Sequence, residues 1–224
     1  MSDAFGQMLP FALVIALSPI PIVAVIAMLF SRHAIGNGIA FLIGWVVGVA
    51  GGLALLTALA DAGGLLGPGD DPSTTVVVIR FLLGVLLLGA AVKKWRGRPR
   101  PGDAVEMPGW MARIDGIGLF GAFGLAVVLG GVNPKNLLMN VAAAAVLASE
   151  GLGGADQAVA IALYTAVASS SVMLAVGYRV LAGERGAMTL ERMREWLVAN
   201  DATVMSVLFL AFGVKLVGDA LTGI

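Results

Sequence analysis

The 224-residue chain contains no cysteine and only one histidine, His33. Disulfides, thiol chemistry and thiolate metal sites are therefore excluded, and a single imidazole cannot form a histidine cluster for a metal ion. The sequence offers no Ser–His pair, no paired acids and no set of metal ligands from which an active site is usually built. We therefore expect a protein that is not an enzyme and that uses no metal and no other cofactor.

Charged residues are also scarce, at 12% of the chain, whereas hydrophobic residues make up 59% and the mean hydropathy is +0.96. Soluble domains are about 45–50% apolar and about 25% charged. The formal net charge is zero, so the sequence gives no reason to expect nucleic acid as a partner. This composition predicts an all-α integral membrane protein that crosses the bilayer several times, with membrane lipids around it.

The apolar residues fall into six runs, each near the roughly 20 residues needed to cross a bilayer core. The fourth run is too long for one straight crossing at about 1.5 Å per residue, which indicates a tilted or broken helix. The N-terminal sequence has no basic segment and carries Asp3, so we expect a retained first helix and not a cleaved signal peptide. The predicted spans are residues 5–30, 36–60, 74–95, 114–149, 155–181 and 200–220.

The positions of lysine and arginine predict the orientation in the membrane. Cytoplasmic loops carry an excess of these residues. Three predicted loops hold nearly all of them, namely 31–36, 93–113 and 179–198, and the opposite side and both termini hold none outside the spans. In a bacterial plasma membrane, both termini should therefore face outward. The residues that set this prediction are Arg32, Lys93, Lys94, Arg96, Arg98, Arg100, Arg113, Arg179, Arg185, Arg192 and Arg194.

Three predicted spans lie on each side of the longest basic loop. We therefore divide the chain into a first three-helix repeat at 1–95, a basic cytoplasmic linker at 96–113 and a second three-helix repeat at 114–224. Because three is odd, the second repeat must enter the membrane from the side opposite to the first. This geometry is the inverted repeat found in many secondary transporters.

Each half interrupts its first helix with proline, in "ALSPIPIV" and in "GGVNPKNL". Ser18 precedes Pro19, and Asn133 precedes Pro134, while Pro21 adds a second disruption. Serine and asparagine are suited to the N-cap, and proline to the first helical position, so both motifs predict a helix that restarts inside the bilayer. Interrupted backbone at this depth is tolerated only when it is buried in protein or lines a wet cavity. A simple proline kink is the alternative.

Lys135 lies in the second of these motifs, in the middle of a predicted span. A charge at the bilayer centre costs at least about 2.5–3.5 kcal/mol. Asn133, Asn136 and Asn140 follow the spacing i, i+3, i+7 and so share one helix face with this region. No acidic residue lies at a comparable depth in another predicted span, so a lysine near two helix N-termini predicts a carboxylate, phosphate or sulfate as ligand. Backbone carbonyls of the broken helix could instead satisfy Lys135.

The stretches "SPIPIVAVIAMLFS", "GNGIAFLIGWVVG" and "NPKNLLMNVAAAA" resemble the GAP family, also called the Sap or sulfolipid-addressing family, within the lysine exporter (LysE) superfamily. The resemblance covers essentially the whole chain. It implies a six-helix exporter of the inner membrane that is built as an inverted repeat and is a homodimer. Relatives are linked to moving glycolipids, glycopeptidolipids or sulfolipids toward the cell surface, and other branches export amino acids or metal ions. The motif residues carried over by position are Ser18, Pro19, Pro21, Asn133, Pro134, Lys135 and Asn136.

The predicted function is therefore a secondary transporter that exports a small or lipidic solute, with substrate bound by the motif residues and Asn140. No GxxxxGK[ST] nucleotide-binding motif is present, so an ion gradient, a partner ATPase or downhill flow would supply the energy. A non-transporting scaffold for envelope-lipid export machinery and an amino-acid exporter are the alternatives. Gly44, Gly48 and Gly52 predict a close helix contact, either within the chain or between two copies.

Overall fold

The computed structural model describes residues 2–63, 74–99 and 116–222, and every regular element within these ranges is a helix. The all-α prediction is therefore confirmed for this part of the chain. Most of the predicted basic linker, including Arg100 and Arg113, lies outside the described residues. The elements are α1 (Ser2–Ala16), α2 (Pro19–Met28), α3 (Ala34–Gly63), α4 (Thr74–Arg96), α5 (Leu119–Val127), the π-helical turn η2 (Val128–Val132), α6 (Pro134–Ser149) and α7 (Gly154–Thr222).

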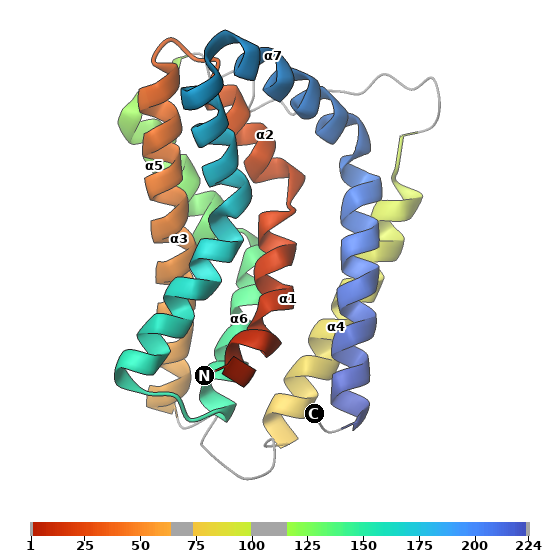
Figure 1. Ribbon diagram of the computed structural model, residues 1–224. Helices are drawn as coiled ribbons and strands as arrows, with labels where there is room; N and C mark the ends of the chain where they lie inside the picture. Colours follow the sequence, from red (N-terminus) through yellow and green to blue (C-terminus); the bar gives the residue numbers. More distant parts are fainter. Residues whose placement is uncertain (1, 64–73, 100–115, 223–224) are drawn as a thin grey trace.

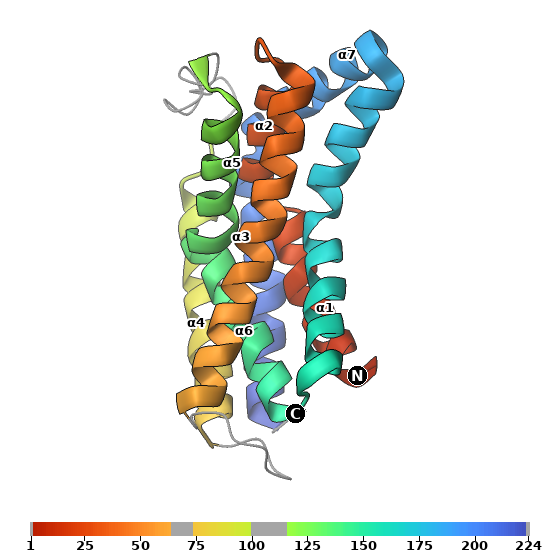
Figure 2. The ribbon, with the colours of Figure 1, turned by 90° about the vertical axis from the view of Figure 1, so that its left-hand side faces the viewer.

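The helices run along one long axis (Figures 1 and 2). In Figure 1, α1 and α2 rise from the lower end to the upper end, α3 descends and α4 rises again. The second half of the chain runs the other way, since α5 and α6 descend and α7 starts upward. Both chain ends lie at the lower end, which we call the terminal end. The upper end carries the connection between α2 and α3, which contains Arg32, and the bend of α7, which lies at Gly183, and we call it the basic end.

Helix α7 is two helices joined at Gly183. This glycine has φ 54° and ψ −129°, a backbone conformation that residues with a Cβ atom rarely adopt. In Figure 1 the first arm (residues 154–182) rises to the basic end, and the second arm (residues 184–222) crosses that end and descends beside α4. Arg179 and Glu184 form an ion pair of 3.5 Å across the turn. The predicted connection at 179–198 is therefore helical on both sides of one glycine.

Two helices among the described residues are long and apolar enough to cross a membrane, at Ala34–Ala60 and Gly154–Thr222. Two further helix pairs pass the same test together but are bent at a short break. The pair α1 and α2 is bent by 52°, and the pair formed by α5 with η2 and α6 is bent by 54°. Counting each bent pair as one span gives up to four. The helix breaks predicted at the two proline motifs are therefore present.

The glycine ridge of α3 is used within the chain. A Cβ built on Gly44 would lie 2.3 Å from the carbonyl oxygen of Phe123, and one built on Gly48 would lie 2.6 Å from that of Val127. Because these neighbours are backbone atoms, only glycine allows α3 to lie this close to α5. Gly84 of α4 and Gly213 of the second arm make a reciprocal contact, since a Cβ on each would lie 3.0–3.1 Å from the carbonyl oxygen of the other.

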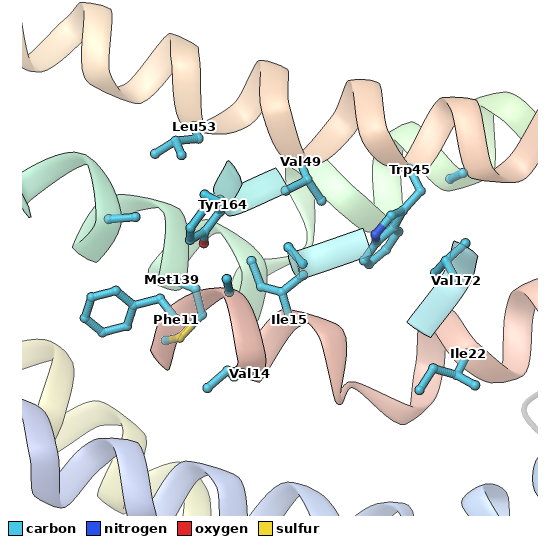
Figure 3. Packing of buried hydrophobic residues seen from close by; sticks show 14 of the residues in the cluster. Phe11, Val14, Ile15, Ile22, Trp45, Val49, Leu53, Met139, Tyr164 and Val172 are labelled. Atoms are coloured by element: carbon cyan, nitrogen blue, oxygen red, sulfur yellow. The ribbon is translucent and has the colours of Figure 1, made fainter. Parts of the chain in front are cut away.

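Side chains from α1, α3, α6 and the first arm of α7 meet in the interior (Figure 3). Trp45 and Tyr164 are the largest of them and are fully buried. Ile15 of α1 points into this group from the turn just before the first break. Burial of apolar side chains at both breaks fixes the positions of the interrupted backbone. The labelled residues of Figure 3 are Phe11, Val14, Ile15, Ile22, Trp45, Val49, Leu53, Met139, Tyr164 and Val172.

Candidate functional site

The first break frees a backbone carbonyl at the end of α1. Pro19 has no N–H, so the carbonyl of Ile15 loses its regular helical donor. The N–H of Ser18 turns to this carbonyl instead, at 3.2 Å, and so leaves the Val14 carbonyl without its usual partner. Ser18 has the extended backbone of an N-cap, with φ −68° and ψ 121°, and only 2% of its surface is exposed. Pro19 and Pro21 are buried in the first turn of α2.

The predicted capping role of the Ser18 side chain is wrong, because its hydroxyl makes no capping hydrogen bond to α2. An N-cap side chain normally accepts from the amide of the second or third helical residue. Pro21 occupies the third position of α2 and has no N–H to give. The second proline of the motif therefore removes one of the two amides that could donate to the serine, and the other, that of Ile20, makes no such bond.

The second break is capped as the sequence predicts. Asn133 precedes Pro134 and accepts a hydrogen bond at Oδ1 from the N–H of Lys135, at 3.0 Å. The preceding turn is π-helical, and the N–H of Asn133 donates to the carbonyl of Val128 at 3.1 Å. Nδ2 of Asn136 donates to the carbonyls of Leu129 and Gly130 in η2, at 2.9 and 3.2 Å. Asparagine side chains therefore bond to backbone groups on both sides of the break, namely two carbonyls of η2 and one amide of α6.

Two glycines before Asn133 allow η2 to approach α3. A Cβ on Gly130 would lie 3.0 Å from the carbonyl oxygen of Trp45, and one on Gly131 would lie 2.9 Å from that of Gly48. Their backbone adopts a π turn, and the absence of side chains brings this turn into contact with the backbone of α3.

Lys135 joins the two breaks. Its Nζ donates to the carbonyl oxygen of Val14 at 3.0 Å, across 121 residues of sequence. This carbonyl is the one freed at the end of α1, where the partial negative charge of the helix is concentrated. A backbone carbonyl therefore does accept a hydrogen bond from Lys135, as the alternative interpretation expected. This carbonyl belongs to α1 and not to the broken helix that contains Lys135. The bond uses one of the three donors of the ammonium group.

Asn140 lies one turn beyond Asn136 and accepts a hydrogen bond from the hydroxyl of Tyr164, at 3.0 Å. Both asparagines are fully buried. Oδ1 of Asn136 and Nδ2 of Asn140 have no hydrogen-bond partner within the part of the chain that the structure describes. Tyr164 is a member of this site that the sequence-based set of binding residues missed. The polar stretch that follows it in the sequence, with Thr165 and Ser169, is the signal that could have indicated it.

Three further buried polar atoms near these helices lack partners in the described ranges. They are Nε1 of Trp45 and the hydroxyl oxygens of Thr165 and Ser169. A buried polar group without a hydrogen bond costs about 1–3 kcal/mol, so native proteins contain few of them. These atoms lie on α3 and on the first arm of α7, and a polar group that reached any of them would gain a hydrogen bond.

Asp201, near the start of the predicted sixth span, forms its ion pair with Lys94 of α4, at 2.6 Å. Within the described ranges no ion pair joins an acidic side chain to Lys135, whose ammonium group donates to Val14. The ion pair of Asp201 follows from the course of the second arm of α7, which descends beside α4 (Figure 1). No group of three or more His, Asp or Glu side chains that could hold a metal ion occurs in residues 2–63, 74–99 and 116–222.

The predicted binding residues thus separate into two groups. Lys135, Asn133 and Asn136 gather at the junction of the two breaks, and Asn140 continues this face toward Tyr164. Pro19, Pro21 and Pro134 shape the backbone and offer no donor of their own. Pro134 is exposed, whereas Ser18 is buried directly after the last turn of α1.

Comparison with known protein families matches residues 8–222 to the family described as Sap, sulfolipid-1-addressing protein. No curated protein and no solved structure matches the chain. The family and the long apolar helices together identify a membrane protein. The match includes both proline breaks, Lys135 and all of α7, and the family predicted from the sequence is confirmed. The chain belongs to the Sap, sulfolipid-1-addressing protein, family.

Proposed function

We propose that this protein is a secondary transporter of the bacterial plasma membrane that exports a small or lipidic solute bearing an anionic group. The observation that carries the proposal is the hydrogen bond from Nζ of Lys135 to the Val14 carbonyl, because it places a cation at the meeting point of two interrupted helices. Ionisable residues inside a membrane protein are rare and usually mark a substrate or ion pathway.

The junction has the groups that an anion requires. The Lys135 ammonium could bind an anionic head group with its other donors or in exchange for the Val14 carbonyl. The unpaired buried atoms of Asn136 and Asn140 would add hydrogen bonds to it. The family description names a sulfolipid, so a sulfated glycolipid is the first substrate class to test. A free amino acid, whose carboxylate suits the same cation, is the second.

The opposite course of the two halves supports transport by an inverted repeat. The first broken helix packs against α7, and the second packs against α3. The third helices, α4 and the second arm, cross through Gly84 and Gly213 in a reciprocal contact. Such pairing is expected when a two-fold axis in the membrane plane relates the halves, and rocking of the halves would then expose the junction to each side in turn.

The same proposal includes an orientation and an assembly. Arg32, Arg179 and Arg185 lie toward the basic end, so this end would face the cytoplasm and both termini would face outward. The protein would act as a homodimer. The α3 glycines pack against α5 and η2, so the contact between copies would use another surface.

Replacement of Lys135 by methionine tests the proposal. Reconstituted wild-type protein should move fluorescent sulfatide, a sulfated glycolipid, between leaflets, as measured by dithionite quenching of the exposed label. Uncharged galactosylceramide, which lacks only the sulfate, should move much more slowly. We expect Lys135→Met to reduce sulfatide movement at least about tenfold, since a hydrogen bond to a charged group contributes about 1.5–3 kcal/mol.

Lys93→Met is the matched control, because Lys93 is exposed at the end of α4 and far along the chain from both breaks. Its transport rate should equal that of the wild type. Equal rates for Lys135→Met and the wild type would rule out the central anchor. If the wild type moves neither sulfatide nor a labelled amino acid, the protein is better described as a scaffold for other envelope-lipid export proteins.

A further inference from the structure

A buried asparagine joins the two halves of the chain at the basic end. Asn37 lies near the start of α3 and is fully buried. Its Nδ2 donates to Oγ of Ser31, at 2.8 Å, and to the carbonyl oxygen of Ile117, at 2.9 Å. Ser31 follows the first broken helix, and Ile117 precedes the second. Both N–H groups of one amide thus hold together segments that are far apart in sequence.

The glycines on either side of Asn37 let apolar side chains from both halves pack beside it. A Cβ on Gly36 would lie 3.0 Å from the side chain of Leu119 in α5, and one on Gly38 would lie 2.4 Å from that of Leu29. Leu29 follows α2 and is fully buried. The sequence GNG at residues 36–38 therefore brings the end of the first broken helix and the start of the second against α3.

A second contact joins the halves at the terminal end. Nε2 of Gln7, in α1, donates to Oε1 of Glu150, at 2.9 Å. Glu150 follows the second broken helix, as Ser31 follows the first. Gln7 lies near the start of the first broken helix, as Ile117 lies near the start of the second. The same relation therefore occurs at both ends with the halves exchanged, as expected for an inverted repeat.

The two contacts differ in burial. The bond between Gln7 and Glu150 is exposed, whereas Asn37 is fully buried and Ser31 is 7% exposed. Water can replace an exposed hydrogen bond, but breaking a buried one leaves polar groups unsatisfied. The basic end is therefore closed more firmly than the terminal end.

We propose that Asn37 is a latch that closes the basic end of the transport path, and that Gln7 and Glu150 form a weaker closure at the terminal end. This inference rests on the proposed function, which requires the junction of the breaks to open to each side in turn. Release of the Asn37 amide frees the start of α5 from the connection between α2 and α3. Without substrate, the protein should open more readily at the terminal end.

Ser169→Cys provides a probe of this opening. Ser169 is fully buried near the middle of the first arm of α7, and its hydroxyl has no hydrogen-bond partner within the described chain. The introduced thiol is the only one in the protein. A membrane-impermeant maleimide, added to right-side-out or inside-out vesicles, reports the side from which the thiol is reached. The vesicles that label Met188→Cys identify the basic-end side, because Met188 is exposed near that end.

Asn37→Leu, in the Ser169→Cys background, keeps the approximate volume of the side chain and removes both donors. We expect labelling from the basic-end side to become about tenfold faster, which corresponds to about 1.4 kcal/mol. Labelling from the terminal-end side should not become faster. Gln7→Ala should have the reverse effect, to a smaller extent, because the bond that it removes is exposed.

Thr57→Val is the matched control. Thr57 is buried in the same helix as Asn37, but its hydroxyl donates to the carbonyl of Leu53 within α3, at 2.9 Å. Loss of this bond does not separate the halves, so labelling should equal that of Ser169→Cys alone on both sides. If Asn37→Leu accelerates labelling equally from both sides, or from neither, its role is only structural and the latch is refuted.

Ser31→Ala keeps the proposal testable if Asn37→Leu fails to fold. It removes one of the two acceptors of the Asn37 amide. Labelling from the basic-end side should again become faster, but less than tenfold, and an unchanged preference between the sides would refute the latch.

Sulfatide movement separates this inference from the proposed function. If Asn37→Leu shifts labelling to the basic-end side while the wild type moves neither sulfatide nor a labelled amino acid, the latch is supported and the proposed substrates are refuted. If the wild type moves sulfatide and Asn37→Leu shifts no labelling, transport is supported and the latch is refuted.

Discussion

Single residues decide how each helix break is satisfied. At the second break, Oδ1 of Asn133 caps α6 through the Lys135 amide. At the first, the Ser18 hydroxyl makes no capping hydrogen bond to α2, and the Val14 carbonyl accepts from a lysine supplied from the other half of the chain. Two motifs that read alike in sequence therefore have different chemistry. The similarity lies in the backbone that each proline interrupts, and the difference lies in which side chain bonds to the interrupted backbone.

This difference gives a prediction for helix capping. Asn133→Ala should lower the free energy of unfolding by about 1 kcal/mol, the usual loss for an N-cap side chain. Ser18→Ala should lower it by less than about 0.5 kcal/mol, because the hydroxyl makes no capping bond. Reversible unfolding in mixed micelles of detergent and denaturing surfactant would measure both. Equal losses at the two positions would show that Ser18 also caps its helix.

A second prediction at this scale concerns the Tyr164 hydroxyl. Tyr164→Phe leaves Oδ1 of Asn140 without its donor in a fully buried position. We expect a loss of about 1–3 kcal/mol in the free energy of unfolding. Tyr178→Phe is the control, since Tyr178 is exposed on the same arm of α7. An unchanged stability for Tyr164→Phe would mean that Asn140 finds another donor, such as water, in the interior.

Helix packing depends on backbone contacts at glycines, and these contacts fix where the second break lies against α3. Gly48→Ala would place a Cβ 2.6 Å from the carbonyl oxygen of Val127, which cannot yield as a flexible side chain could. We expect this variant to lose about 1–3 kcal/mol of stability. Gly51→Ala is the matched control on the same helix, because a Cβ there meets nothing within 4 Å. It should be neutral or slightly stabilising.

Sequence reasoning predicted the elements whose signal is local. Both helix breaks follow from proline after a capping residue, and the Asn133 cap and the close contact at Gly44 and Gly48 follow from residue type and spacing. The ion pair between Lys94 and Asp201 could not be predicted in this way. It forms only because the chain turns at Gly183 and returns beside α4, which is a tertiary relation that hydropathy does not contain.

At the scale of the whole molecule, the two ends differ in charge and should face different compartments. The absence of cysteine makes this prediction simple to test, since any single introduced cysteine is the only thiol. Asp156 and Met188 are exposed, near the terminal end and the basic end respectively. In intact cells, a membrane-impermeant thiol reagent should label Asp156→Cys and should label Met188→Cys only after the membrane is opened. The reverse pattern would invert the proposed orientation.

The bond between Lys135 and Val14 also constrains the order of biosynthesis. Its two ends are separated by 121 residues, so at about 5–20 residues per second the ribosome reaches the lysine roughly 6–24 s after the valine. A half-chain that ends before α6 lacks the donor for this carbonyl. The bond at the first break can therefore form only after the second half of the chain has been synthesised.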